Sequence, residues 1–116
     1  MSEFIEVSGV GELEDGAMKA VNAAGREVLL AKVGDKYYAA GNRCPHMGGK
    51  LSQGKLEGTV VTCPWHGSQF DLSDGHVIRW AKMPALVSRI EKAIKRPRTL
   101  TTYAVKLEGD SILVEI

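Results

Sequence analysis

Short stretches of hydrophobic residues recur along the chain, and turn sequences such as Ala24-Gly25 and Gly34-Asp35 separate them. Stretches of this kind predict β-strands. The expected strands cover residues 4–7, 17–22, 27–33, 36–40, 59–62, 69–72, 76–80, 102–107 and 111–116. Many short strands at such spacing are typical of a β-sandwich or a small β-barrel. The pattern therefore predicts an all-β fold, in one domain over residues 1–116.

One segment has a different hydrophobic pattern. Its apolar residues follow helical spacing at Leu86, Val87, Ile90, Ala93 and Ile94. Pro84 suits the first turn of a helix, and Pro97 marks an end. We therefore expect one short inserted helix over about residues 84–95.

The composition narrows the class of protein. A chain of 116 residues with 44% hydrophobic residues can bury a core without disulfide cross-links. Its two cysteines are too few for a multi-disulfide secreted scaffold or for a ferredoxin cluster held by four cysteines. The net charge of +1 gives no case for a nucleic-acid partner. No apolar run has the length of a signal peptide or a membrane span, so we expect a cytoplasmic protein.

The near-neutral net charge hides two charged regions. Residues 1–16 carry five acidic side chains and no Lys or Arg, whereas residues 82–98 carry six basic side chains and one acidic one. The basic side chains of the expected helix are Arg89, Lys92 and Lys95, followed directly by Arg96. These charges form either the solvated face of a helix that packs on the β framework or a docking surface for an acidic partner protein.

Both cysteines stand in short motifs that also contain a histidine. The motifs are Cys44-Pro45-His46 and Cys63-Pro64-Trp65-His66, with sixteen residues between His46 and Cys63. Thiolate and imidazole are ligands of zinc and of iron–sulfur centres. Glycines beside each motif allow the backbone to approach a bound centre closely. The third histidine, His76, is outside both motifs and is interpreted as an ordinary strand residue.

The two motifs leave several interpretations open. Buried core thiols with unrelated histidines would make the pairing a coincidence, and a Cys–His nucleophile would use only one pair. A structural zinc site could use all four residues, although the usual zinc-finger spacing groups cysteine with cysteine. Each motif here mixes the two residue types. Such mixing suits a binuclear centre in which one iron binds both thiolates and the other binds both imidazoles.

The combined pattern resembles the motif of the Rieske family at every ligand position. It reads Cys44-Pro45-His46, sixteen residues, and then Cys63-Pro64-Trp65-His66-Gly67. Neighbouring residues are also similar to the family, namely Leu51, Gly54, Phe70-Asp71 and Gly75. The resemblance covers nearly the whole chain. It implies a small Rieske-type sandwich or barrel with two cluster-binding loops within about residues 41–75.

This resemblance implies a [2Fe-2S] cluster. In that comparison Cys44 and Cys63 bind one iron, and His46 and His66 bind the other. The implied function is one-electron transfer from a reductase to a terminal oxygenase or related oxidoreductase, without a substrate site. Two alternatives stay open: a small Rieske-like subunit of a larger oxidoreductase such as nitrite reductase, and a structural or sensory metal-binding module.

Two differences from high-potential Rieske proteins indicate a lower reduction potential. The Rieske proteins of cytochrome bc complexes resemble this chain but carry an extra cysteine pair where Gly49 and Trp65 stand. Ser68 matches a serine donor in those proteins, whereas Phe70 takes the place of a tyrosine. Hydrogen bonds to the cluster stabilise its reduced, more negative state, so a protein with fewer of them has a lower reduction potential. We therefore expect a value in the lower part of the Rieske range of about −150 to +300 mV.

Overall fold

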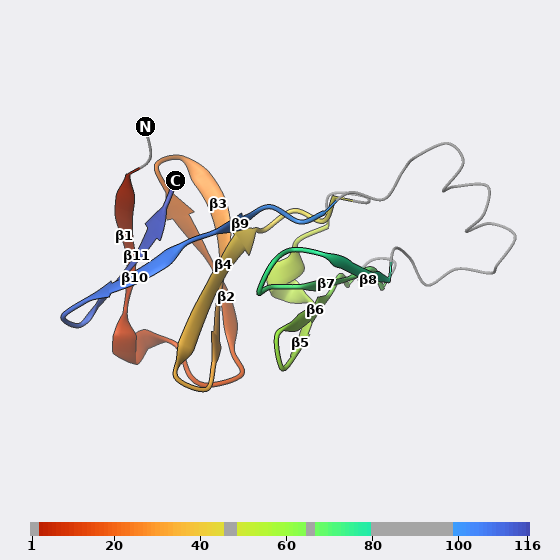
Figure 1. Ribbon diagram of the computed structural model, residues 1–116, viewed down its shortest axis with the longest axis horizontal. Coiled ribbons are helices and arrows are strands. Elements are labelled where there is room, and N and C mark those ends of the chain that lie inside the picture. The colour runs from red at the N-terminus through yellow and green to blue at the C-terminus, as the bar shows by residue number, and fades with distance from the viewer. Residues whose placement is uncertain (1–2, 46–48, 65–66, 80–98) are drawn as a thin grey trace, which may run out of the picture.

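The computed structural model describes residues 3–45, 49–64, 67–79 and 99–116 (Figure 1). Within these ranges the chain forms three antiparallel sheets. The first sheet has the strand order β1-β11-β10, the second β2-β3-β4-β9, and the third β5-β6-β7-β8. The predicted all-β class is therefore confirmed.

The strands of each sheet have the following bounds. The first sheet contains β1 (Phe4–Gly9), β10 (Val105–Glu108) and β11 (Ser111–Glu115). The second contains β2 (Met18–Ala23), β3 (Arg26–Val33), β4 (Lys36–Gly41) and β9 (Thr102–Tyr103). The third contains β5 (Lys55–Glu57), β6 (Val60–Thr62), β7 (Gln69–Asp71) and β8 (Val77–Arg79). The 3₁₀ helix η1 (Val10–Glu12) follows β1, and η2 (Leu51–Gln53) precedes β5.

Strand β3 is buried on both of its faces and separates two hydrophobic clusters. Val28 and Leu30 pack in one cluster with Val114 of β11. Leu29 and Ala31 pack in the other, which also contains both cysteines of the chain. Successive side chains of a strand point to opposite faces, so a strand covered on both faces is apolar at consecutive positions. The core of the fold thus extends directly to the candidate metal ligands.

Most strand predictions agree with the structure to within one or two residues at each end. Strand β5 is not predicted because its sequence, Lys-Leu-Glu, is short and mostly charged. The single strand expected over residues 102–107 is wrong, because the chain changes sheets at Ala104. Strand β9 pairs with β4, whereas β10 pairs with β11. Neither 3₁₀ helix is predicted by the hydrophobic pattern.

Figure 1 shows the third sheet beside the other two sheets. The inserted helix expected over about residues 84–95 lies outside the described residues. No helix in the described ranges is long and apolar enough to cross a membrane.

Candidate metal centre

The first cysteine loop follows β4 and is closed by backbone contacts. The N–H of Cys44 donates to the carbonyl oxygen of Gly49 at 2.8 Å. One residue outward on each side, Arg43 and Lys50 form an antiparallel bridge. This closure fixes the backbone on which the Cys44 thiol is carried.

Asn42 joins the base of the first loop to η2. Its carbonyl oxygen accepts a hydrogen bond from the N–H of Leu51 at 3.0 Å. Its Oδ1 accepts another from the N–H of Ser52 at 2.8 Å. The residue is buried, and its Nδ2 has no partner in the described part of the chain. Buried hydrogen bonds of this kind are costly to break, so Asn42 holds the two ends of the loop together.

Glu27 of β3 adds a charged contact at the same base. Its carboxylate lies 3.6 Å from Nε of Arg43 and 3.5 Å from Nζ of Lys50. These two basic residues stand on opposite arms of the first loop. A single carboxylate therefore links both arms to the second sheet.

The second cysteine loop connects β6 to β7 and repeats the backbone contact of the first. The N–H of Cys63 donates to the carbonyl oxygen of Ser68 at 2.8 Å, and the N–H of Gly67 donates to that of Cys63 at 3.2 Å. Gly67 has a φ of 73°, which is a left-handed conformation that favours glycine. In both loops the cysteine N–H binds the carbonyl five residues later. The two motifs that match in sequence are thus also closed by matching hydrogen bonds.

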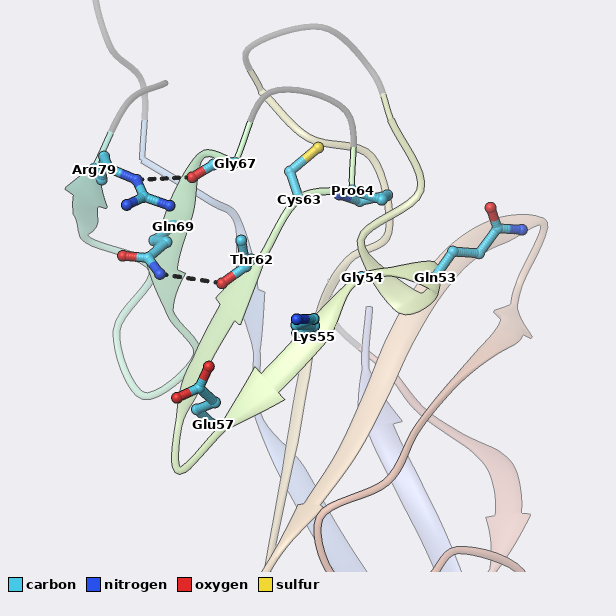
Figure 2. A pocket seen from close by; sticks show the side chains of 10 residues that line it. All are labelled: Gln53, Gly54, Lys55, Glu57, Thr62, Cys63, Pro64, Gly67, Gln69 and Arg79. Carbon is cyan, nitrogen blue, oxygen red and sulfur yellow. Dashed lines mark hydrogen bonds between the residues drawn. The ribbon is translucent and has the colours of Figure 1, made fainter. Parts of the chain in front are cut away.

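Side chains of the third sheet support the second loop (Figure 2). Nε of Arg79 donates to the carbonyl oxygen of Gly67 at 3.0 Å. Nε2 of Gln69 donates to Oγ1 of Thr62 at 3.2 Å, across the two strands that flank the loop. These residues and Cys63 line an open pocket of about 650 Å³. Sequence reasoning does not select Arg79, because nothing in the sequence shows that its side chain reaches residue 67.

The two thiols and one nearby hydroxyl fit a metal–sulfur cluster. Cys44 and Cys63 are each 3% exposed, lie in the same hydrophobic cluster and do not form a disulfide. The Oγ of Ser68 is fully buried and has no hydrogen-bond partner among the described residues. Thiolates are soft metal ligands, and a buried hydroxyl requires an acceptor. A sulfide-rich cluster between the loops would supply one.

His46 and His66, the other two predicted ligands, lie outside the described residues. The described part of the chain holds no group of three or more His, Cys, Asp and Glu side chains that could bind a metal ion. The third histidine, His76, directly precedes β8, and its Nδ1 lies 2.5 Å from Oδ1 of Asp74. Its ring therefore has a local partner in the turn before β8.

Two carboxylates with lowered pKa values lie at the turn between β7 and β8, Asp71 at the end of β7 and Asp74 within the turn. The hydroxyl and the backbone N–H of Ser73 donate to Asp71, and these hydrogen bonds lower the pKa of that carboxyl. The backbone N–H and the ring of His76 lower the pKa of Asp74 in the same way. Hydrogen bonds to a carboxylate favour its charged form. The turn is therefore held together by ionised acids.

Gly75 attaches this turn to the segment that leads into β9. The N–H of Leu100 donates to the carbonyl oxygen of Gly75 at 2.8 Å. Gly75 has a φ of 81°, and a Cβ atom there would lie 2.0 Å from the carbonyl oxygen of Leu100. Only glycine permits this approach. The structure thus gives a physical reason for a residue that the sequence pattern marks only by resemblance.

Comparisons with known proteins agree with this arrangement. A family model described as "Rieske [2Fe-2S] domain" matches residues 3–104. The chain is 30% identical over 114 residues to the ferredoxin component of the naphthalene 1,2-dioxygenase system of Pseudomonas aeruginosa, covering 98% of this chain and 96% of that protein. It is also 42% identical over 108 residues to apoptosis-inducing factor 3 of Homo sapiens, covering 93% of this chain but only 16% of that protein.

A solved structure shows the same fold. The ferredoxin of carbazole 1,9a-dioxygenase from Nocardioides aromaticivorans superposes with a TM-score of 0.79 at 25% sequence identity. The match covers 96% of this chain and 95% of that one. The similarity therefore includes the whole β framework as well as the cysteine loops.

Proposed function

Because this chain belongs to the Rieske [2Fe-2S] domain family, we propose that it carries single electrons from a reductase to a terminal oxygenase. The cluster is held by four side chains, Cys44, His46, Cys63 and His66. The thiolates of the two cysteines bind one iron, and the imidazoles of the two histidines bind the other. The protein acts as an electron carrier and leaves the chemistry on the organic substrate to its partner.

The observation that carries this assignment is the matched pair of closed loops. Each loop buries one cysteine, and in each the cysteine N–H binds a carbonyl oxygen five residues later. Loops fixed in this way hold their ligands at one geometry. A fixed ligand geometry lowers the structural rearrangement that accompanies electron transfer.

When bound, the cluster accepts and returns one electron. The chain contributes by excluding water from the two thiols, which are buried in the same hydrophobic cluster as Leu29 and Ala31 of β3. Neutral imidazoles in place of two thiolates make the site less negative, which raises the reduction potential above that of a four-cysteine cluster. Phe70 is fully buried and contributes no hydroxyl donor, so the expected potential is in the lower part of the Rieske range.

The purified protein tests this assignment directly. We expect two irons and two sulfides per chain, visible absorption, and the low-average-g electron paramagnetic resonance signal of a reduced histidine-ligated cluster. A reductase of a ring-hydroxylating oxygenase system should reduce the protein, and the oxygenase should oxidise it, with one electron per chain in each reaction. A colourless protein containing one zinc would overturn the assignment in favour of a structural metal-binding module.

The basic segment that contains Arg89, Lys92, Lys95 and Arg96 is the proposed docking surface for the redox partners. The support for docking through the basic segment is its charge, since Arg89, Lys92, Lys95 and Arg96 lie close together in the sequence. Opposite charges accelerate transient encounters, most strongly at low salt. Replacing Lys92, Lys95 and Arg96 with Glu should therefore slow electron exchange at low ionic strength. An unchanged second-order rate, with Lys36→Glu as the control, would reject this surface.

The second candidate is a small Rieske-like subunit of a larger oxidoreductase, and one observation favours it: a similar sequence also occurs as part of a much longer protein. The chain is 42% identical to a stretch that makes up only 16% of apoptosis-inducing factor 3. A unit of this kind would purify in a stable stoichiometric complex, whereas a shuttling carrier would purify alone. The cytoplasmic location expected from the sequence remains a prediction, supported by the similarity to bacterial ferredoxin components.

A further inference from the structure

Two arginines lie beside the two cysteine loops, and among the described residues only one of them has a carboxylate within ion-pair distance. Arg43 in the first loop has the carboxylate of Glu27 at 3.6 Å. Arg79, at the end of β8, forms no ion pair with any acidic side chain of the described residues. The second loop therefore has an adjacent positive charge with no carboxylate within ion-pair distance among the described residues; the acidic residue that shares its pocket is Glu57.

The position of this charge is fixed by the fold. Arg79 stands opposite Gln69 of β7, at an irregularity in the register of the two strands. From there its Nε reaches the carbonyl oxygen of Gly67 at 3.0 Å, as Figure 2 shows. A hydrogen bond to a carbonyl orients the guanidinium but leaves its full charge in place. The side chain remains exposed to solvent.

The same hydrogen bond brings the charge close to a candidate ligand. The Gly67 carbonyl belongs to the peptide that precedes Ser68, and the Ser68 carbonyl accepts the N–H of Cys63. Arg79 and Cys63 also line one pocket. Arg79 thus holds the loop that carries Cys63 and the buried hydroxyl of Ser68, which has no hydrogen-bond partner among the described residues.

We infer that Arg79 is a positioning residue that raises the reduction potential of the cluster through its positive charge, an inference that rests on the proposed function. Reduction adds one electron, and therefore one negative charge, to the cluster, and no bond forms or breaks. A nearby positive charge stabilises the more negative, reduced state. Because the guanidinium is exposed, dissolved ions screen the interaction.

The test is the midpoint potential of the cluster-loaded protein, measured by mediated titration at low and at high salt. Arg79→Gln is expected to have a lower potential than the wild type, and the difference should shrink as salt is added. Arg79→Lys keeps the charge and should stay closer to the wild type than Arg79→Gln does. The matched control is Lys36→Gln, because Lys36 begins β4, about 17 Å along the strand from the end that enters the first loop.

Three outcomes would overturn the inference. The potential of Arg79→Gln could equal that of the wild type, Arg79→Lys could fall as far as Arg79→Gln, or Lys36→Gln could shift the potential equally. If Arg79→Gln does not retain a cluster, Gln69→Lys provides a second test because it adds a charge in the same pocket and leaves Arg79 in place. Its potential must rise, and an unchanged or lower value would reject the inference.

Failure of this inference differs from failure of the proposed function. A wild-type protein without the Rieske resonance signal would refute the proposed cluster itself. A wild-type protein with that signal, but with a potential that does not respond to Arg79, would refute only the role of Arg79.

Discussion

The carbonyl oxygen of Thr62 lies where a side chain on residue 54 would begin, since a Cβ atom built on Gly54 would be 1.9 Å from it. Gly54 directly follows η2, the 3₁₀ helix that is joined to the base of the first cysteine loop. Thr62 ends β6 and directly precedes Cys63 of the second loop. The two loops are therefore brought together at a contact that only glycine allows.

Gly54→Ala is expected to separate the two loops. The obstructing atom belongs to the backbone of β6, so it cannot rotate away as a side chain would. Overpacking of this kind typically costs about 1–3 kcal/mol. We expect a lower unfolding temperature and a loss of cluster absorption. Gly11→Ala is the matched control, since a Cβ atom there meets nothing within 4 Å, and an equal effect of both variants would contradict the prediction.

The three histidines should respond differently to substitution. His46→Gln and His66→Gln each remove a proposed iron ligand, so both proteins should lose the visible absorption and iron of the wild type. His76→Gln should retain both, because the His76 ring contacts Asp74 in a turn and is exposed. Iron analysis of the three purified variants checks this assignment. Retention of a normal cluster by His46→Gln or His66→Gln would contradict it.

Glu27→Gln should weaken the base of the first loop in a salt-dependent manner. The substitution removes the charge that lies within ion-pair distance of Arg43 and Lys50. Partly exposed ion pairs contribute about 0.2–1 kcal/mol each. The unfolding temperature should fall at low ionic strength, and the difference from the wild type should narrow at high salt. When Lys50→Gln is already present, adding Glu27→Gln should lower the free energy of unfolding by less than it does in the wild type. An equal loss in both backgrounds would disprove the interaction between Glu27 and Lys50.

Asp71 should make the stability of the fold depend on acid pH. Its pKa in the folded protein lies below the ordinary value of 3.8, because Ser73 donates to the carboxylate. Its contribution to the free energy of unfolding is therefore complete above the pKa that Asp71 has in the unfolded chain. That contribution is lost as the pH falls through the lower pKa that Asp71 has in the folded protein. Asp71→Asn should lower the free energy of unfolding at pH 7, by about 1 kcal/mol for a partly exposed charged hydrogen bond.

Chemical unfolding of the wild type and Asp71→Asn from pH 7 to pH 3 measures this contribution. The difference between the two proteins should stay constant down to about pH 4 and then shrink. Ser73→Ala should reproduce part of the loss at neutral pH, because it removes one of the two donors. A difference that grows as the pH falls would have the wrong sign for this explanation.

The strands and the candidate cysteine ligands can be predicted from the sequence because both depend on local patterns. Alternating or continuous apolar residues identify strands such as β3, whose consecutive hydrophobic side chains indicate burial on both faces. Four scarce metal-binding residues in two matched motifs identify the candidate centre. The structure places both cysteines in one hydrophobic cluster, as that interpretation requires.

Tertiary structure alone decides which distant residues support those motifs. Glu27 precedes Arg43 by sixteen positions, and Arg79 follows Gly67 by twelve, yet both pairs are in contact. The division between β9 and β10 is likewise decided by pairing with different sheets. Motifs and periodicity depend on residues that are near one another in the sequence. Charge balance and close backbone contacts depend on which strands lie next to one another in the folded protein. The two cysteines therefore indicate the candidate metal centre in the sequence. The fold determines which charged residues and glycines support its loops.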